Sequence, residues 1–241
     1  MLNISQFSKS YVPGKLAVDD LSFTVNAGEM MGFIGQNGAG KTTTLRCVAG
    51  ILDFRDGEIS IAGHSIKTEP VAAKRLTAFL PDNPDLYEFL SGIDYLTFIA
   101  DIYSIPKEKR RLGIEKYAEA FALTGALGSP IAGYSHGMKQ KLALISALIR
   151  EPKLLILDEP FVGLDPEAAY LTKGYLREIC DKGGAVIFST HVLEVAEKIC
   201  DTITIIKNGR LIETGKTAEV VGSSNLEAVF LELAKEDRSN E

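Results

Sequence analysis

The order of apolar and polar positions divides the chain into three stretches. Short β-prone segments fill residues 2–34, helical spacing dominates residues 84–150, and strands alternate with helices from residue 154 onward. Such alternation is typical of βαβ units, whose strands form a parallel sheet. We therefore predict an α/β fold in which the middle stretch is a helical insertion.

The expected elements follow from these patterns. Short apolar, β-prone segments predict strands at Leu2–Phe7, Leu21–Val25, Met30–Ile34, Gly57–Ala62, Leu154–Leu157, Ala185–Phe188 and Thr202–Ile206. A period of about 3.6 residues predicts helices at Lys41–Ala49, Ile93–Tyr103, Lys107–Thr124, Gly137–Ile149, Glu167–Cys180, Val192–Ile199 and Asn225–Ala234. The closing helix is amphipathic, so one of its faces is suited to packing on a core.

Composition narrows the class of protein. The 241 residues suit one large or two small domains, and 46% apolar with 24% charged residues is ordinary globular usage. A net charge of −6 argues against a general nucleic-acid binder. The three cysteines lack metal-ligand spacing, which fits reduced thiols in a cytoplasm. No stretch suits a signal peptide or membrane span, so work at a membrane would need another subunit.

Residues 35–42 fit the phosphate-binding loop pattern G-x-x-x-x-G-K-[ST] between a predicted strand and a predicted helix. Glycines allow the backbone N–H groups to converge on phosphates, and the helix adds its positive N-terminal end. The lysine supplies a charge for the β and γ phosphates, and the hydroxyl after it is a ligand for Mg²⁺. We expect the nucleotide to contact Gly35, Asn37, Gly38, Ala39, Gly40, Lys41, Thr42 and Thr43.

A second group of candidates follows two predicted apolar strands. Asp158 and Glu159 come directly after Leu154–Leu157, and His191 follows the strand that ends near Phe188. Ligands bind at the carboxyl ends of strands in open α/β sheets. Asp158 is placed to hold Mg²⁺, Glu159 is the candidate base that polarises the attacking water, and His191 is the candidate γ-phosphate contact.

In this order, the motifs resemble those of the nucleotide-binding subunits of ABC transporters. The likeness runs from about Ile4 to Leu233 and includes the phosphate loop, Asp158-Glu159-Pro160, and Gly163-Leu164-Asp165-Pro166 in place of the D-loop. Tyr134-Ser135-His136-Gly137-Met138 stands where the family has its LSGGQ signature. The resemblance implies that Tyr11 stacks on adenine beside Val18, and that His191 is the switch histidine.

Several positions depart from the family pattern. Asp82 stands where the Q-loop normally has glutamine, and its carboxylate is a further candidate for Mg²⁺ or its water. In the signature, Tyr134, His136 and Met138 replace the leucine, the first glycine and the glutamine, while Ser135 and Gly137 remain. Their hydroxyl and open backbone are the groups that matter most for contacting a phosphate, and His136 adds a hydrogen-bond donor or charge.

The resemblance also implies a domain plan. Residues 1–241 would form a single ABC ATPase domain with a P-loop NTPase core, a mixed or parallel sheet, an N-terminal antiparallel β subdomain and an inserted α-helical subdomain. The core would comprise residues 1–82 and 151–222, the helical signature subdomain residues 83–150, and the C-terminal helix and tail residues 223–241.

The implied function is hydrolysis of ATP, with Mg²⁺, to power transport. Two ATPase subunits, identical or paralogous, would close head to tail so that Ser135, His136, Gly137 and Asp165 of one face the ATP of the other. Residues 83–105 would meet membrane-spanning permease subunits, which would hold the chain at the cytoplasmic face of the membrane. Leu86–Leu90, Tyr95-Leu96 and Asn225–Leu231 look like ATPases of ABC-2-type exporters.

Other functions are also compatible with these motifs. A soluble ABC ATPase with a non-membrane partner, such as an iron–sulfur assembly subunit, would share the nucleotide chemistry. A small-molecule kinase would use a second substrate pocket instead of Ser135 from a partner, and a binding module without turnover is possible if Asp82 and His136 impair hydrolysis. A GTPase lacks its guanine-reading segment here, and a DNA-repair ATPase lacks the long coiled coil between Lys41 and Asp158.

Overall fold

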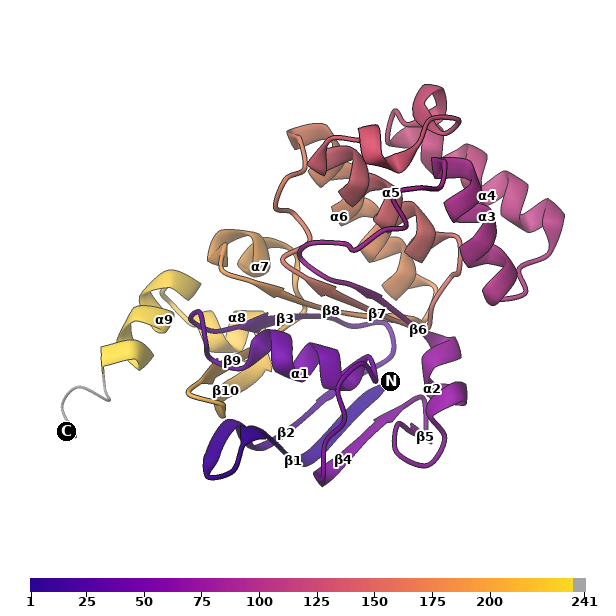
Figure 1. The fold of residues 1–241 in the computed structure, drawn as a ribbon. Helices are drawn as coiled ribbons and strands as arrows, with labels where there is room; N and C mark the ends of the chain where they lie inside the picture. Colours follow the sequence, from indigo (N-terminus) through magenta and orange to yellow (C-terminus); the bar gives the residue numbers. More distant parts are fainter. Residues whose placement is uncertain (236–241) are drawn as a thin grey trace.

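The computed structural model describes residues 1–235, and its centre is a six-stranded sheet (Figure 1). The strand order is β10–β9–β3–β8–β7–β6. β3 pairs in parallel with β8 and β9, β7 pairs in parallel with β6 and β8, and β10 pairs antiparallel with β9. The strands are β3 (Met30–Ile34), β6 (Thr77–Leu80), β7 (Leu154–Asp158), β8 (Ala185–Thr190), β9 (Thr202–Lys207) and β10 (Arg210–Lys216).

A second, antiparallel sheet is formed by N-terminal strands in the order β2–β1–β4–β5. Its strands are β1 (Leu2–Val12), β2 (Lys15–Val25), β4 (Asp56–Ile61) and β5 (His64–Ser65). The first two are longer than the sequence predicts, because their distal ends extend past the core. Tyr11, Val12 and Leu16 are each at least half exposed there, so no buried face marks the strand in the sequence.

The two faces of the central sheet carry separate cores, because successive side chains of a strand point to opposite faces. Met31 and Phe33 pack with the N-terminal sheet and with α1 (Lys41–Val48), whereas Met30 and Ile34 pack with the helices of the other face. β7 and β8 are buried on both faces, as the central strands of a parallel sheet should be. Helix α1 therefore lies between the two sheets, directly after β3 (Figure 1).

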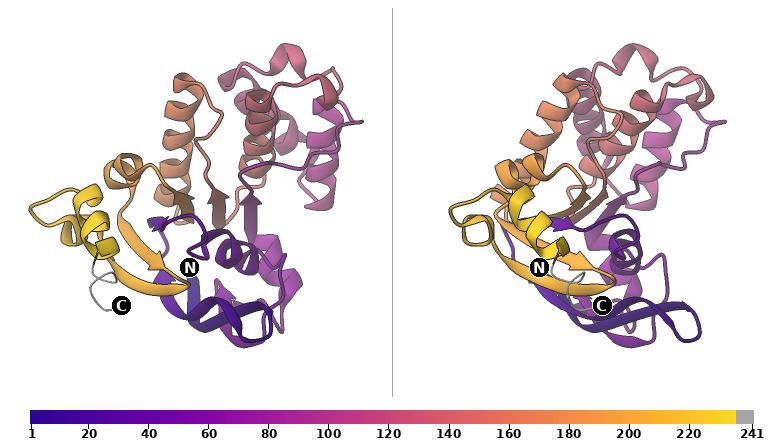
Figure 2. Two further views of the ribbon diagram at one scale, coloured as in Figure 1. Left: turned by 60° about the vertical axis from the view of Figure 1, so that its left-hand side comes forward. Right: turned by 90° about the vertical axis from the view of Figure 1, so that its left-hand side faces the viewer.

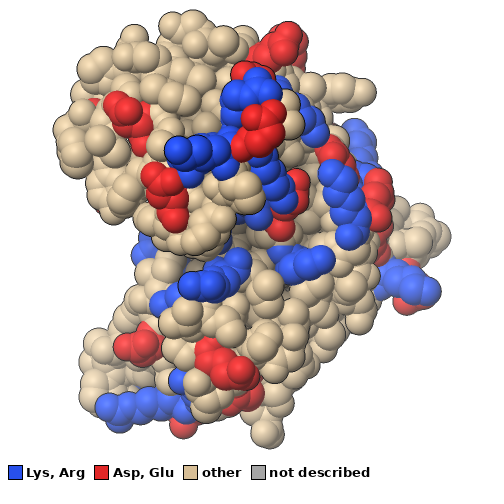
Figure 3. Space-filling model, turned by 90° about the vertical axis from the view of Figure 1, so that its right-hand side faces the viewer, with Lys and Arg blue, Asp and Glu red and all other residues tan. Residues whose placement is uncertain are grey.

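Two groups of helices lie at opposite ends of the molecule (Figure 2). Residues 92–148 form a helical block beyond the β6 edge, and α8 and α9 lie at the opposite end of the molecule. Figure 3 shows Lys, Arg, Asp and Glu side chains gathered over part of the face that lies on the right in Figure 1. The helices are α2 (Pro70–Leu76), α3 (Gly92–Ile102), α4 (Lys107–Ala120), α5 (His136–Leu148), α6 (Pro166–Asp181), α7 (Leu193–Ile199), α8 (Thr217–Val221) and α9 (Leu226–Lys235).

The predicted fold class is confirmed, and so are most of the predicted elements. The strands β5, β6 and β10 and the helices α2 and α8 were not predicted. β10 is an edge strand without a buried residue, so it shows no apolar alternation. The predicted helix at Lys107–Thr124 ends at Ala120, because Ala122 adopts a left-handed φ of 54° before a short 3₁₀ turn.

Within residues 1–235, no helix has the length and apolar character needed to cross a membrane. The end of the predicted C-terminal tail, residues 236–241, lies outside the described part of the chain.

Two glycine-to-alanine variants should change stability in opposite directions. A Cβ at Gly32 in β3 would lie 2.9 Å from Cδ1 of Ile203 and 3.0 Å from Sγ of Cys200, so Gly32→Ala should lower the free energy of unfolding by about 1–3 kcal/mol. Gly174 in α6 has open space around it, so Gly174→Ala should raise that free energy by roughly 0.5–1 kcal/mol. Urea unfolding measures both changes, and equal effects would contradict the packing described for β3.

Candidate functional site

The loop between β3 and α1 is held close to neighbouring backbone on two sides. A Cβ at Gly40 would lie 2.7 Å from the carbonyl oxygen of Ala17, and one at Gly35 would lie 2.6 Å from that of Ile206. Gly40 also has a φ of 102°, which strongly favours glycine. The loop can take this path only with glycine at both positions, and it ends at the N-terminus of α1, where backbone N–H groups are free to bind an anion.

Lys41 folds back over this loop. Its Nζ donates to the carbonyl oxygens of Gly35 at 2.6 Å and Gln36 at 3.2 Å, and the residue is 8% exposed. Burial lowers the pKa of Lys41, and the nearby carboxylates of Glu159 and Asp158 only partly oppose that effect. A buried ammonium of this kind is stabilised further by an anionic ligand in the loop.

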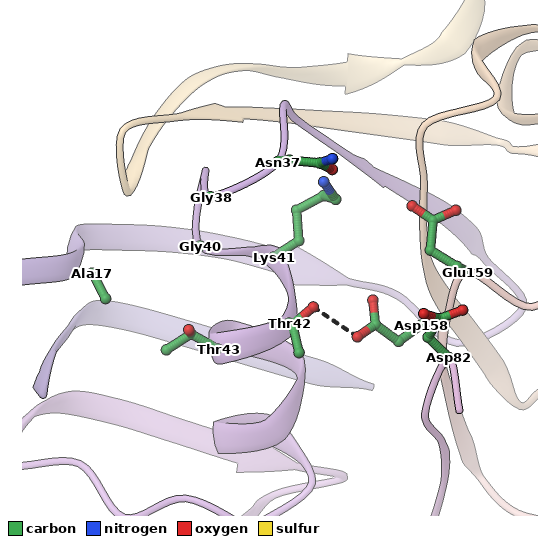
Figure 4. Close-up of a pocket in the computed structure, with 10 residues that line it drawn as sticks. All are labelled: Ala17, Asn37, Gly38, Gly40, Lys41, Thr42, Thr43, Asp82, Asp158 and Glu159. Carbon is green, nitrogen blue, oxygen red and sulfur yellow. Dashed lines mark hydrogen bonds between the residues drawn. The ribbon is translucent and has the colours of Figure 1, made fainter. Parts of the chain in front are cut away.

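Asp158 is fixed by two hydroxyl groups. Thr42 Oγ1, at the start of α1, donates to Asp158 Oδ2 at 2.7 Å (Figure 4). Ser189 Oγ donates to the other carboxylate oxygen. Asp158 and Ser189 are register partners at the ends of β7 and β8. Ser189 was not predicted from the sequence, although a polar residue that ends the neighbouring strand in register is the signal that would identify it.

Glu159 and His191 lie together at the same edge of the sheet. The Nδ1 of His191 is 2.9 Å from Oε2 of Glu159. Glu159 has a left-handed φ of 50°, and its backbone N–H donates to the carbonyl oxygen of Ser189 at 3.2 Å. Its side chain is 15% exposed and that of His191 is 61% exposed. The carboxylate is therefore partly sheltered while the imidazole faces solvent.

Several of these groups line a cavity of about 360 Å³ (Figure 4), whereas His191, although it contacts Glu159, is not part of the lining. Figure 4 shows Lys41, Thr42, Asp158 and Glu159 converging on it from the loop and from the end of β7, with Asp82 beside Asp158. Its lining is formed by Ala17, Asn37, Gly38, Gly40, Lys41, Thr42, Thr43, Asp82, Asp158 and Glu159. Three carboxylates face one ammonium, so an anionic ligand needs an accompanying cation to enter without strong repulsion.

The donor set around Asp158 fits Mg²⁺. A hydroxyl and one or two carboxylates are hard oxygen ligands, and magnesium in proteins commonly completes its shell with water and substrate phosphates. Within the described residues, no group of three or more His, Cys, Asp or Glu side chains is placed to hold a metal ion alone. The site therefore suits an ion that arrives with a phosphate ligand, and Thr42, Asp158 and Asp82 are the oxygen donors that could hold it.

Four other predicted contacts lie around this cavity without lining it. Tyr11 is 59% exposed, and its hydroxyl is 3.1 Å from Oγ1 of Thr43. Val18 is fully buried against Gly40, and its neighbour Ala17, which the sequence analysis did not single out, lines the cavity instead. Gly35 and Ala39 are buried within the loop. The exposed Tyr11 ring is thus available for stacking, whereas the Val18 side chain is covered.

The last group of predicted residues lies outside the cavity. Ser135 is exposed and caps α5 by accepting from the N–H of Met138 at 3.3 Å, and His136 is exposed at the start of the same helix. Asp165 caps α6 through the N–H of Ala168 and pairs with Nζ of Lys141 at 2.6 Å. Lys141 holds the pKa of Asp165 below its usual value. The cavity that contains Lys41 is lined, within one chain, by none of the four residues Ser135, His136, Gly137 and Asp165.

Comparisons with known proteins agree on one family. The model of the family described as "ABC transporter" matches residues 18–162. The uncharacterized ABC transporter ATP-binding protein YhcH of Bacillus subtilis (strain 168) is 39% identical over 88% of this chain and 69% of its own length. The ABC-type transporter ATP-binding protein EcsA of the same strain is 32% identical over 100% of this chain and 99% of its own length.

The chain is also similar to solved structures of ATP-binding subunits. The chain superposes on a structure described as the ATP-binding subunit of an ABC transporter with a TM-score of 0.94, at 34% identity over 98% of this chain and 100% of that one. A dimeric, post-hydrolysis structure of the ATP-binding cassette MJ0796 with ADP and phosphate gives a TM-score of 0.82 over 90% of this chain and 99% of that one. The identity to that cassette is 20%, so this second likeness concerns the fold alone.

Proposed function

The chain belongs to the ABC transporter family of ATP-binding proteins, and on that premise we propose that it hydrolyses ATP to power transport through separate membrane subunits. The observation that carries the proposal is the convergence of Lys41, Asp158 and Glu159 on one cavity at the ligand edge of the sheet. In the domain plan we propose, residues 1–82 and 151–222 form the ATP-binding core, residues 83–150 the helical subdomain and residues 223–241 the C-terminal helix and tail.

We propose that ATP binds with its phosphates in the loop of residues 35–43 and its adenine beside Tyr11. The buried ammonium of Lys41 and the free N–H groups of α1 favour the β and γ phosphates. Thr42, Asp158 and Asp82 would hold Mg²⁺, which when bound neutralises charge on those phosphates. Asp82 adds a carboxylate where the family has an amide, so binding of ATP should depend strongly on the magnesium concentration.

In the proposed hydrolysis, Glu159 orients the attacking water and accepts its proton. The water oxygen bonds to the γ phosphorus as the bond from that phosphorus to the bridging oxygen breaks, which releases phosphate and ADP. His191 contacts Oε2 of Glu159 and is exposed enough to reach a γ phosphate. These roles are supported by the 2.9 Å contact between the two side chains and by their position at the end of β7 and β8.

We propose that a second ATPase subunit completes the site. Ser135, His136 and Gly137 stand at the exposed N-terminus of α5, where N–H groups and the helix dipole favour an anion. They are absent from their own chain's cavity, so a neighbouring chain placed head to tail would bring them to the phosphates. The cassette MJ0796, which shares the fold, was solved as a dimer.

We further propose that residues 83–105 contact a membrane subunit of an exporter, which would hold the chain at the cytoplasmic face of the membrane. Tyr87 packs against Phe89, Phe98 and Tyr95, with ring centroids 5.5–6.4 Å apart. Phe89 is 82% exposed, and Tyr87 and Phe98 are 50% and 41% exposed. An exposed aromatic cluster of this kind is typical of an interaction site.

The base role of Glu159 is tested by Glu159→Gln. The amide keeps the shape of the side chain but cannot accept the proton, so ATP should still bind while kcat falls by about a hundredfold or more. Uncleaved ATP should then hold two subunits together, and size-exclusion chromatography with Mg²⁺ and ATP should show a dimer. Glu219→Gln, a change on α8 outside the cavity, is the matched control. Undiminished turnover in Glu159→Gln would remove Glu159 from its proposed role.

The partner is tested by Phe89→Asp. A charge in the aromatic cluster should prevent recovery of a membrane subunit when the tagged chain is purified from detergent-solubilised native membranes, while ATP binding stays unchanged. Val71→Asp, at another exposed apolar residue on α2, is the control and should keep the complex. If the unmodified chain instead co-purifies with a soluble scaffold protein and with no membrane protein, the result would favour the soluble ABC ATPase.

A further inference from the structure

The imidazole of His136 covers the backbone of Gly163 within the same chain. A Cβ at Gly163 would lie 2.5 Å from Cδ2 and 2.8 Å from Nε2 of His136, so the ring fills the space that a side chain would occupy. A Cβ at Gly137 would lie 2.9 Å from the carbonyl oxygen of Gly163. The first turn of α5 and the loop of residues 159–165 therefore pack against each other without a gap.

A second contact joins the same two segments. Nζ of Lys141, one turn along α5, is 2.6 Å from Oδ2 of Asp165, and Oδ1 of Asp165 caps α6. The loop is thus attached to α5 at Gly163 through a ring and at Asp165 through an ion pair. Position 136 is where the family signature has glycine, which has no side chain to make the first of these contacts.

The loop begins with Glu159, whose backbone conformation is unfavourable and must be stabilised by surrounding contacts. Glu159 has a φ of 50°, a conformation that is costly for a residue with a side chain and persists only where its surroundings enforce it. The bonds available within the loop are long: the N–H of Val162 reaches the Glu159 carbonyl oxygen at 3.2 Å, and that of Leu164 reaches Phe161 at 3.4 Å. Outside the loop, Ser189 accepts from the N–H of Glu159 and His191 contacts its carboxylate, while the contacts with α5 restrain the far end of the loop at Gly163 and Asp165.

We infer that His136 is a positioning residue that seats Gly163 and thereby keeps the Glu159 carboxylate directed at the cavity. The inference rests on the proposed role of Glu159 as the base. It gives His136 a task within its own chain, in addition to any contact with a phosphate across the dimer. The ring supplies this restraint by its shape, whereas a phosphate contact depends on its N–H groups.

Two substitutions separate the ring from its polar atoms. His136→Phe keeps a planar ring over Gly163 but cannot donate to a phosphate, and His136→Gln keeps a donor but loses the ring. His136→Ala removes both. Lys139→Ala is the matched control on the same turn of α5, because Lys139 pairs with Glu88 and not with the loop.

Hydrogen exchange on the nucleotide-free chain tests the contact without any dimer or ATP. Exchange of the hydrogen-bonded amides of Glu159, Val162 and Leu164 should rise by about tenfold in His136→Ala and His136→Gln, because local opening becomes easier. It should stay near the unmodified rate in His136→Phe and Lys139→Ala. Unchanged exchange in His136→Ala would overturn the inference.

Steady-state kinetics then test whether the contact matters for turnover. His136→Phe keeps the ring but loses the donor, so its kcat should exceed those of His136→Ala and His136→Gln by roughly tenfold or more. If kcat falls equally in His136→Phe and His136→Ala, the loss comes from a missing phosphate contact, and the positioning role is overturned. Full turnover in Glu159→Gln would instead refute the proposed base, even where the exchange result stands.

Discussion

The structure depends on the close approach of one loop to the backbone around it. Gly35 and Gly40 bring the loop after β3 against the carbonyl oxygens of Ile206 and Ala17, at separations that exclude any side chain. That path places the start of α1 beside the end of β7, where Thr42 reaches Asp158. An anion site and a cation site are therefore built next to each other from residues more than a hundred positions apart in the chain.

The functional residues fall into two groups with different surroundings. Lys41, Asp158 and Glu159 line a cavity and are held by hydrogen bonds within the core. Ser135 and His136 lie at an exposed helix start and touch no part of that cavity. A site divided in this way is incomplete in one chain, which is the physical reason for proposing that ATP joins two subunits. The contact between His136 and Gly163 links the two groups within a chain.

The sequence predicted what depends on local pattern. β3 was placed at its observed bounds, because a buried apolar run followed by a glycine-rich loop leaves little freedom. The roles assigned to Ser135, His136 and Asp165 came from a resemblance and stay predictions. β10 and Ser189 were missed, since an exposed edge strand and a single hydroxyl carry no periodic signal. The ring of His136 over Gly163 could not be predicted, because it joins segments that meet only in the folded chain.

The central claim is that the loop around Lys41 binds the phosphates of ATP. Isothermal titration of the purified chain with ATP and Mg²⁺ tests it most directly, alongside Lys41→Ala, whose unchanged circular dichroism would show that the variant is folded. We predict saturable binding to the unmodified chain and a loss of affinity of at least about a hundredfold in the variant, because a buried charged partner of the phosphates is removed. Equal affinity in both, or no binding to the unmodified chain, would contradict the account.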